Sequence, residues 1–198
     1  LHNIKLPAPA PYGIADTDES AILVLDAHTI ELPANLNTLT QADAVAYMRY
    51  LSVANRRGYT HRRITPDTLA RLEDGTAVIA GWLNGDSASG PANTALDKVQ
   101  LLALFAALIG VKPAVAAARE AWGDTTLTTL APFIQKVAVP SPTRALGTWD
   151  KQLLKELRDH INTIIDEETA ESAEPVTLAR FSWRSMIILL LVIVAVIV

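Results

Sequence analysis

The chain has 198 residues, of which 50% are hydrophobic and 19% charged, and it carries a formal net charge of −4. These values allow one compact domain with an appendage, and the acidic balance argues against a nucleic-acid-binding protein. The absence of cysteine excludes disulfides, thiolate metal sites and a cysteine nucleophile. The four histidines (His2, His28, His61 and His160) lack the spacing of metal ligands, so we expect no metal site and no cofactor.

The first third of the chain is expected to contain a strand and a helix. A proline-rich stretch at 6–13 and an acidic turn at 16–20 precede residues 21–27, whose apolar run predicts a buried strand. The prolines favour a rigid edge leading into that strand, with a proline-rich recognition motif as the alternative. Residues 40–58 then predict a helix, in which Thr40 and Asp43 form a capping box and Gly58 ends the last turn.

A polar loop, HRRITPDT at 61–68, separates this helix from a predicted hairpin with strands at 69–72 and 76–82. Asp74 and Gly75 supply the turn between the two strands. The loop at 83–94 is rich in Gly, Ser and Asn but lacks the pattern of a phosphate-binding loop, so we expect a surface loop there.

The remainder is expected to be helical. Residues 96–109 are apolar nearly all round, which indicates a central buried helix, and further helices are predicted at 113–122, 125–139 and 148–165. The last of these has an apolar stripe typical of core packing, and a surface that binds a partner is the alternative. Residues 166–179 begin with an acidic run without large apolar residues and are predicted to be a linker.

The sequence ends in an uncharged apolar run at 186–198. As a helix, this run covers only about 20 Å at ~1.5 Å per residue, against a hydrocarbon core of about 30 Å. We interpret residues 180–198 as the start of a transmembrane helix, and a buried C-terminal helix or strand is the alternative. Because the run is cut short and the chain begins at Leu1, we expect it to be part of a longer protein.

Flanking residues predict the orientation of this membrane segment. Arg180 and Arg184 lie on its N-terminal side with Trp183, which predicts that residues 1–179 face the cytoplasm. The positions expected in the bilayer are Met186, Leu190, Val194 and Val198.

The loop at 61–68 resembles the catalytic loop of protein kinases, whose pattern is His-Arg-Asp-(Leu/Ile)-x-Pro-x-Asn. His61, Arg62, Ile64 and Pro66 match it. In that family the aspartate accepts the substrate hydroxyl proton and the asparagine binds a metal ion, but this chain has Arg63 and Thr68 there.

The sequence departs from the family pattern in a second segment as well. Where kinases carry the metal-binding Asp-Phe-Gly triplet, this chain has Ala80-Gly81-Trp82. The order of elements, from strand and helix through loop and hairpin to a buried helix, is similar to that of kinases. The resemblance therefore implies an α+β, protein-kinase-like fold over residues 1–165. This would be mainly the large helical lobe with residual small-lobe strands, N-terminally incomplete and catalytically dead. Alternatives are a working phosphotransferase that uses Asp67 or Asp74 instead, or a chance match in an unrelated α+β domain.

A more specific resemblance rests on residues 95–147, 153–161 and 179–184 and extends over roughly residues 10–198. These segments are similar to a family of large actinobacterial membrane proteins. There a kinase-like domain precedes a flippase-like transmembrane region of the lysylphosphatidylglycerol-synthase type. A looser resemblance is to the pseudokinase domain of the mycobacterial type of lipid II flippase. The family carries an aspartate that opens the buried helix and holds the catalytic-loop backbone; the matching residue is Asp97.

These resemblances imply a non-catalytic regulatory or scaffolding domain on the cytoplasmic face of the cell membrane. Its expected partners are the lipid bilayer and an unknown cytoplasmic protein, with no nucleic acid. The membrane region would handle a lipid or a lipid-linked envelope precursor. Two alternatives stay open: an active phosphotransferase, and a tail-anchored binding protein without a polytopic region.

Overall fold

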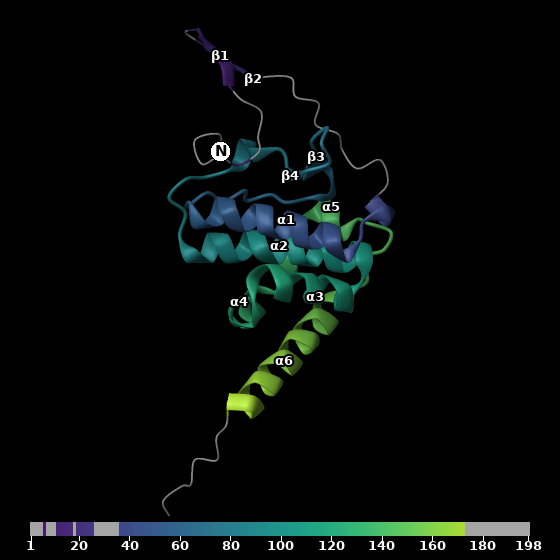
Figure 1. The fold of residues 1–198 in the computed structure, drawn as a ribbon. Coiled ribbons are helices and arrows are strands. Elements are labelled where there is room, and N and C mark those ends of the chain that lie inside the picture. The colour runs from purple at the N-terminus through teal and green to yellow at the C-terminus, as the bar shows by residue number, and fades with distance from the viewer. Residues whose placement is uncertain (1–5, 7–10, 18, 26–35, 173–198) are drawn as a thin grey trace, which may run out of the picture. The chain divides into compact units, whose positions relative to one another are not determined.

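The computed structural model describes Leu6 and residues 11–17, 19–25 and 36–172 (Figure 1). Contacts divide the chain into two units, Leu1–Ile165 and Asp166–Val198. The four positions predicted to lie in the bilayer (Met186, Leu190, Val194 and Val198) fall outside the described residues.

The protein is α+β, with helix predominating and two small antiparallel sheets, as the sequence predicts at this coarse level. The elements in chain order are β1 (Pro11–Asp16), β2 (Ala21–Leu25), α1 (Gln41–Arg56), β3 (Leu69–Arg71), β4 (Ala77–Ile79), α2 (Pro91–Ile109), α3 (Val111–Trp122), α4 (Asp124–Leu130), α5 (Ser141–Arg144) and α6 (Leu153–Ser172). Strand β1 pairs with β2, and β3 pairs with β4.

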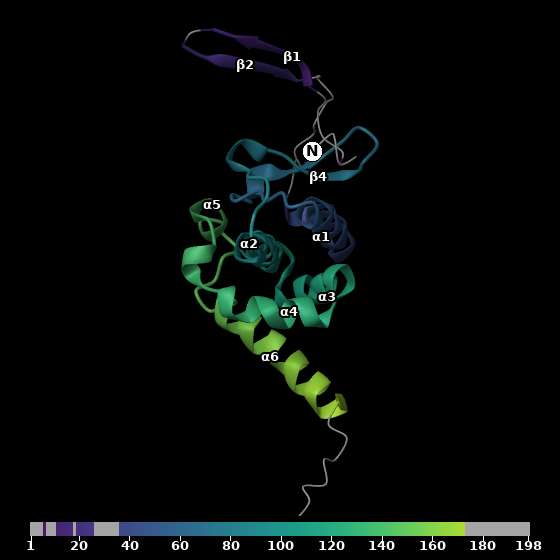
Figure 2. The ribbon, with the colours of Figure 1, turned by 90° about the vertical axis from the view of Figure 1, so that its left-hand side faces the viewer.

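Helices α1, α2 and α3 form the centre of the core. Figures 1 and 2 show α1 and α2 side by side with α3 against them. The Tyr47 ring of α1 meets the Phe105 ring of α2 at a centroid distance of 5.7 Å. The indole of Trp122, at the end of α3, donates a hydrogen bond of 3.1 Å to the Met48 carbonyl on α1. These contacts tie the three helices into one apolar core.

The burial of helix α2 accounts for its apolar composition. The helix is buried almost continuously from Val99 to Ala107, which confirms the prediction of a central helix. By length and composition alone α2 is also able to cross a membrane, but 56% of its most apolar window is buried inside the protein. That burial is typical of the core helix of a globular domain.

The start of α1 has the geometry that its sequence predicts. The Thr40 hydroxyl accepts the Asp43 backbone N–H, and the Asp43 carboxylate accepts the Thr40 backbone N–H at 2.8 Å. At the other end, Gly58 adopts a φ of +81°, a left-handed conformation that glycine tolerates well.

The N-terminal hairpin differs from the prediction. Strand β1 was not predicted, because the proline-rich stretch was interpreted as a rigid edge leading into the strand at 21–27. The prediction of a buried strand at 21–27 is wrong about burial, since Ile22 and Val24 of β2 are exposed. Within the described part of the chain, strand β2 pairs only with β1, and two paired strands have no core of their own.

Three predicted helices differ from the structure by five residues or more at one or both ends. Helix α2 begins at Pro91 rather than 96, because proline fits the first turn, where its missing N–H has no helical partner. The helix predicted at 125–139 is wrong: α4 ends at Leu130 because Pro132 cannot extend it. Helix α6 starts at Leu153 and continues to Ser172, inside the segment predicted to be a linker.

Candidate functional site: the 61–68 loop and its cavity

A buried carboxylate on α2 anchors the 61–68 loop. Asp97 Oδ2 accepts the backbone N–H of His61 at 2.6 Å, and its Oδ1 accepts that of Arg62 at 2.8 Å. One helical turn further, Gln100 Oε1 accepts the backbone N–H of Ile64 at 2.8 Å. Residues three apart lie on the same helix face, so α2 presents two polar side chains to one stretch of backbone.

The buried position raises the pKa of Asp97 above its usual value, and the hydrogen bonds from His61 and Arg62 oppose that rise. A carboxylate removed from water needs such donors, because an unpaired buried charge is strongly destabilising. Two consecutive backbone N–H groups therefore replace the lost water at this site. The backbone turns sharply to present them: Arg62 has a φ of +66°, which is uncommon for a residue other than glycine.

The His61 side chain joins the loop to the end of the β3–β4 hairpin. Its Nε2 lies 2.7 Å from the Ala80 carbonyl, and its Nδ1 accepts the Arg63 backbone N–H at 3.3 Å. The ring meets the Trp82 ring edge-on at 4.8 Å. This pattern fits the neutral tautomer with the proton on Nε2. Burial lowers the pKa of His61, which keeps the ring neutral near pH 7.

Thr68 closes the loop on itself. Its hydroxyl donates to the Thr65 carbonyl at 2.8 Å and accepts the Thr65 N–H at 3.1 Å. Its carbonyl accepts the N–H of Ala80 at 2.8 Å. The structure therefore brings together His61, Thr68, Ala80 and Asp97, four of the residues that the sequence singled out.

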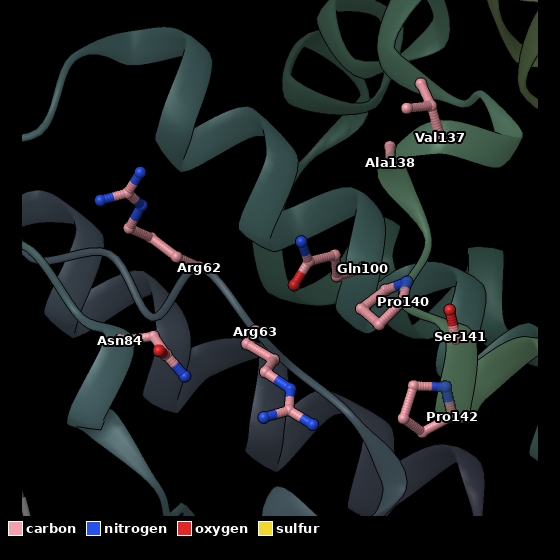
Figure 3. Close-up of a pocket in the computed structure, with 9 residues that line it drawn as sticks. All are labelled: Arg62, Arg63, Asn84, Gln100, Val137, Ala138, Pro140, Ser141 and Pro142. Atoms are coloured by element: carbon pink, nitrogen blue, oxygen red, sulfur yellow. The ribbon is translucent and has the colours of Figure 1, made fainter.

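Arg63, the fifth of those residues, has an exposed side chain. It lines an open cavity of about 820 Å³ next to the loop (Figure 3). The lining residues are Arg62, Arg63, Asn84, Gln100, Val137, Ala138, Pro140, Ser141 and Pro142. This lining holds two arginines and no carboxylate, so the cavity is cationic.

The two carboxylates considered as substitutes lie elsewhere in the described structure. Asp67 is exposed on the turn that ends the loop, and Asp74 is exposed in the β3–β4 turn. Asp74 Oδ1 accepts the Thr76 backbone N–H at 2.9 Å, which lowers the pKa of Asp74. Neither lines the cavity. Among the described residues, no group of three or more His, Cys, Asp or Glu side chains is arranged to hold a metal ion.

No family model, curated protein or solved structure matches the chain. Function is therefore inferred from the loop, its anchor on α2 and the cavity.

Gln100, Asn84 and residues 137–142 belong to the site but were not predicted from the sequence. Gln100 carried a signal, because it is a polar residue three positions after Asp97 in an otherwise apolar run. Residues 137–142 carried none, because only the packing of distant segments brings Pro140 and Ser141 to the cavity.

Proposed function

We propose that residues 1–165 form a protein-kinase-like domain without phosphotransfer chemistry, which acts as a regulatory or scaffolding module. The observation that carries this proposal is the Asp97 carboxylate, whose two oxygens hold the backbone of His61 and Arg62. Such an anchor is what the kinase-like resemblance implies for this aspartate. The two hydrogen bonds support the proposal that the backbone arrangement of a kinase catalytic loop is preserved.

The chemistry expected of a kinase is missing from that arrangement. An exposed guanidinium, that of Arg63, stands where the catalytic base would lie, and a guanidinium is not deprotonated in proteins. The Thr68 hydroxyl is engaged by Thr65, and Ala80 has only a methyl group where a metal-binding carboxylate would stand. Three separate changes would have to be compensated for transfer to occur.

Phosphate transfer and nucleotide binding test the proposal directly. The full chain is incubated with ATP and Mg²⁺ or Mn²⁺, transfer to itself and to general protein substrates is measured, and thermal unfolding is followed with and without the nucleotide. We expect no transfer and no metal-dependent rise in Tm. The proposal fails if transfer occurs and Asp67→Asn or Asp74→Asn abolishes it, because a displaced carboxylate would then be acting as the base.

Attachment to the cytoplasmic face of a membrane is a second part of the proposal, and it rests on the apolar run at 186–198 and on Arg180 and Arg184. The neighbouring membrane region would handle a lipid or lipid-linked envelope precursor. We expect the full chain to resist extraction by alkaline carbonate and to be digested by protease only when the cytoplasmic side is open. A stop codon shortly after Val198 would instead favour a tail-anchored binding protein.

A further inference from the structure

The cavity beside the loop has two cationic groups that are weakly paired or unpaired among the described residues. No ion pair or hydrogen bond of the Arg63 guanidinium is recorded among the described residues. Arg62 Nη1 lies 3.8 Å from Asp86 Oδ2, and both side chains are about half exposed. An exposed pair at that distance is worth little, so both arginines are available to a ligand.

Amide groups add further donors between the two walls of the cavity. Figure 3 shows Gln100 between the arginine-bearing loop and the segment with Pro140. The Oε1 atom of Gln100 is held by the Ile64 N–H, which leaves its Nε2 as a donor next to the cavity. Gln100 is only 8% exposed, so its orientation is fixed by its surroundings. Figure 3 shows Asn84 on the other side of Arg63 from Gln100.

Apolar groups border the same cavity. Val137 is 90% exposed and lines it together with Pro140 and Pro142. Leu83 is 98% exposed and directly precedes Asn84, another lining residue. Exposed aliphatic side chains next to unused cations are a common feature of surfaces that bind other proteins.

We infer that this cavity binds an extended acidic peptide segment of a protein partner. Carboxylates of the segment pair with Arg62 and Arg63, and aliphatic side chains between them lie on the prolines and on Val137. This inference rests on the proposed scaffolding function and names its binding surface and the chemistry of its partner.

The geometry favours a peptide over a single small anion or a membrane. Figure 3 shows the two guanidinium groups pointing in different directions, so separate carboxylates spaced along a chain suit them better than one compact anion. A lipid surface would need cations spread over a broad face, whereas these two lie in one cavity of a chain with a net charge of −4.

Fluorescence anisotropy with a labelled short peptide of alternating glutamate and leucine tests the inference on the full chain. We expect saturable binding that weakens as salt is added, because ion pairs at an open cavity are screened. Arg63→Gln should weaken binding about tenfold, the loss expected for a charge-assisted hydrogen bond. The same peptide with glutamine in place of glutamate should not bind.

Arg57→Gln is the matched control, because it removes the same charge from an exposed position outside the cavity lining. It should leave the affinity unchanged, and urea unfolding of both variants should match that of the parent chain. Equal weakening by the two variants would overturn the inference, since binding would then depend on overall charge alone.

Two competing occupants have their own outcomes. The first is the chain's own acidic segment at 166–175. It is the occupant if a peptide of that sequence binds through Arg63 and if replacing its acidic residues in the full chain strengthens binding of the glutamate–leucine peptide. If phosphatidylglycerol vesicles bind through Arg63 and the peptide does not, the occupant is a membrane. Either result overturns the inference.

Failure of this inference is distinguishable from failure of the proposed function. Absence of both phosphate transfer and peptide binding removes the peptide site but leaves the catalytically dead domain standing. Phosphate transfer together with Arg63-dependent peptide binding would remove the catalytically dead domain but leave the peptide site standing.

Discussion

Asp97 is the residue on which the loop depends most, because it satisfies two consecutive backbone N–H groups from inside the core. Asp97→Asn keeps one acceptor oxygen but turns the amide NH2 group, which is a donor, toward the second N–H. An unpaired buried donor costs about 1–3 kcal/mol, so we expect a fall of that size in the free energy of unfolding. Urea titration measures it. Asp67→Asn, at an exposed position of the same loop, should change it by less than about 0.5 kcal/mol.

His61 gives the loop a pH dependence. Burial lowers its pKa below the usual 6.5, so below pH 6.5 the unfolded chain binds a proton there that the native chain does not. Stability therefore falls with decreasing pH, by up to about 1.4 kcal/mol per unit. Asp97 acts in the opposite direction above pH 3.8, because its pKa is raised and the native state takes up a proton where the unfolded chain is still ionised.

Comparison of the parent chain with His61→Gln isolates this effect. Between pH 7 and 5 the unfolding free energy of the parent should fall relative to that of the variant, as measured by urea titration at each pH. A constant difference across this range would mean that the histidine is not held neutral in the native state.

At the scale of elements, the start of α1 is linked to the second hairpin through one side chain. Asp43 completes the capping box with Thr40 and also pairs with Arg71 on β3. Thr40→Ala should lower the unfolding free energy by about 1 kcal/mol, the usual effect of losing a cap. Asp43→Ala should cost more, about 2 kcal/mol, because it also removes a charged partner. Glu156→Ala on the exposed face of α6 is the control; equal losses for Thr40 and Asp43 would contradict the link.

An element could be predicted from the sequence when the interactions that form it are between residues close together in the chain. The cap at Thr40 and the left-handed Gly58 depend on neighbouring residues only, and both could be predicted. Pro132 was also a local signal against a helix that continues to residue 139, and the prediction of a helix at 125–139 did not take it into account. The contact of Asp97 with the loop came from the family resemblance, since nothing in the spacing of residues 61 and 97 requires it.

The cavity shows the limit of prediction from the sequence. Arg62 and Arg63 are conspicuous as a pair, but the other wall comes from residues 137–142, far along the chain. Only the packing of α2 against segments on both sides brings the two walls together. A cavity of this kind could not be predicted from periodicity or from local motifs.

At the scale of the whole molecule, the first unit, Leu1–Ile165, contains the core, the loop and the cavity. We expect residues 1–165 to remain in solution without detergent and to unfold at the same urea concentration as the full chain. Fluorescence of Trp82, Trp122 and Trp149, all within this unit, reports the transition.

Leu102→Ala in the same fragment then tests the role of α2. Leu102 is fully buried, and in a packed core its truncation should lower the unfolding free energy by about 2–5 kcal/mol. Leu83→Ala, at a 98% exposed position, is the control and should change it by less than about 0.5 kcal/mol. If the fragment instead needs detergent and Leu102→Ala has little effect, α2 belongs in a membrane rather than in a globular core. The anchoring of the loop by Asp97 would then need a different explanation, because it depends on α2 being the central helix of the domain.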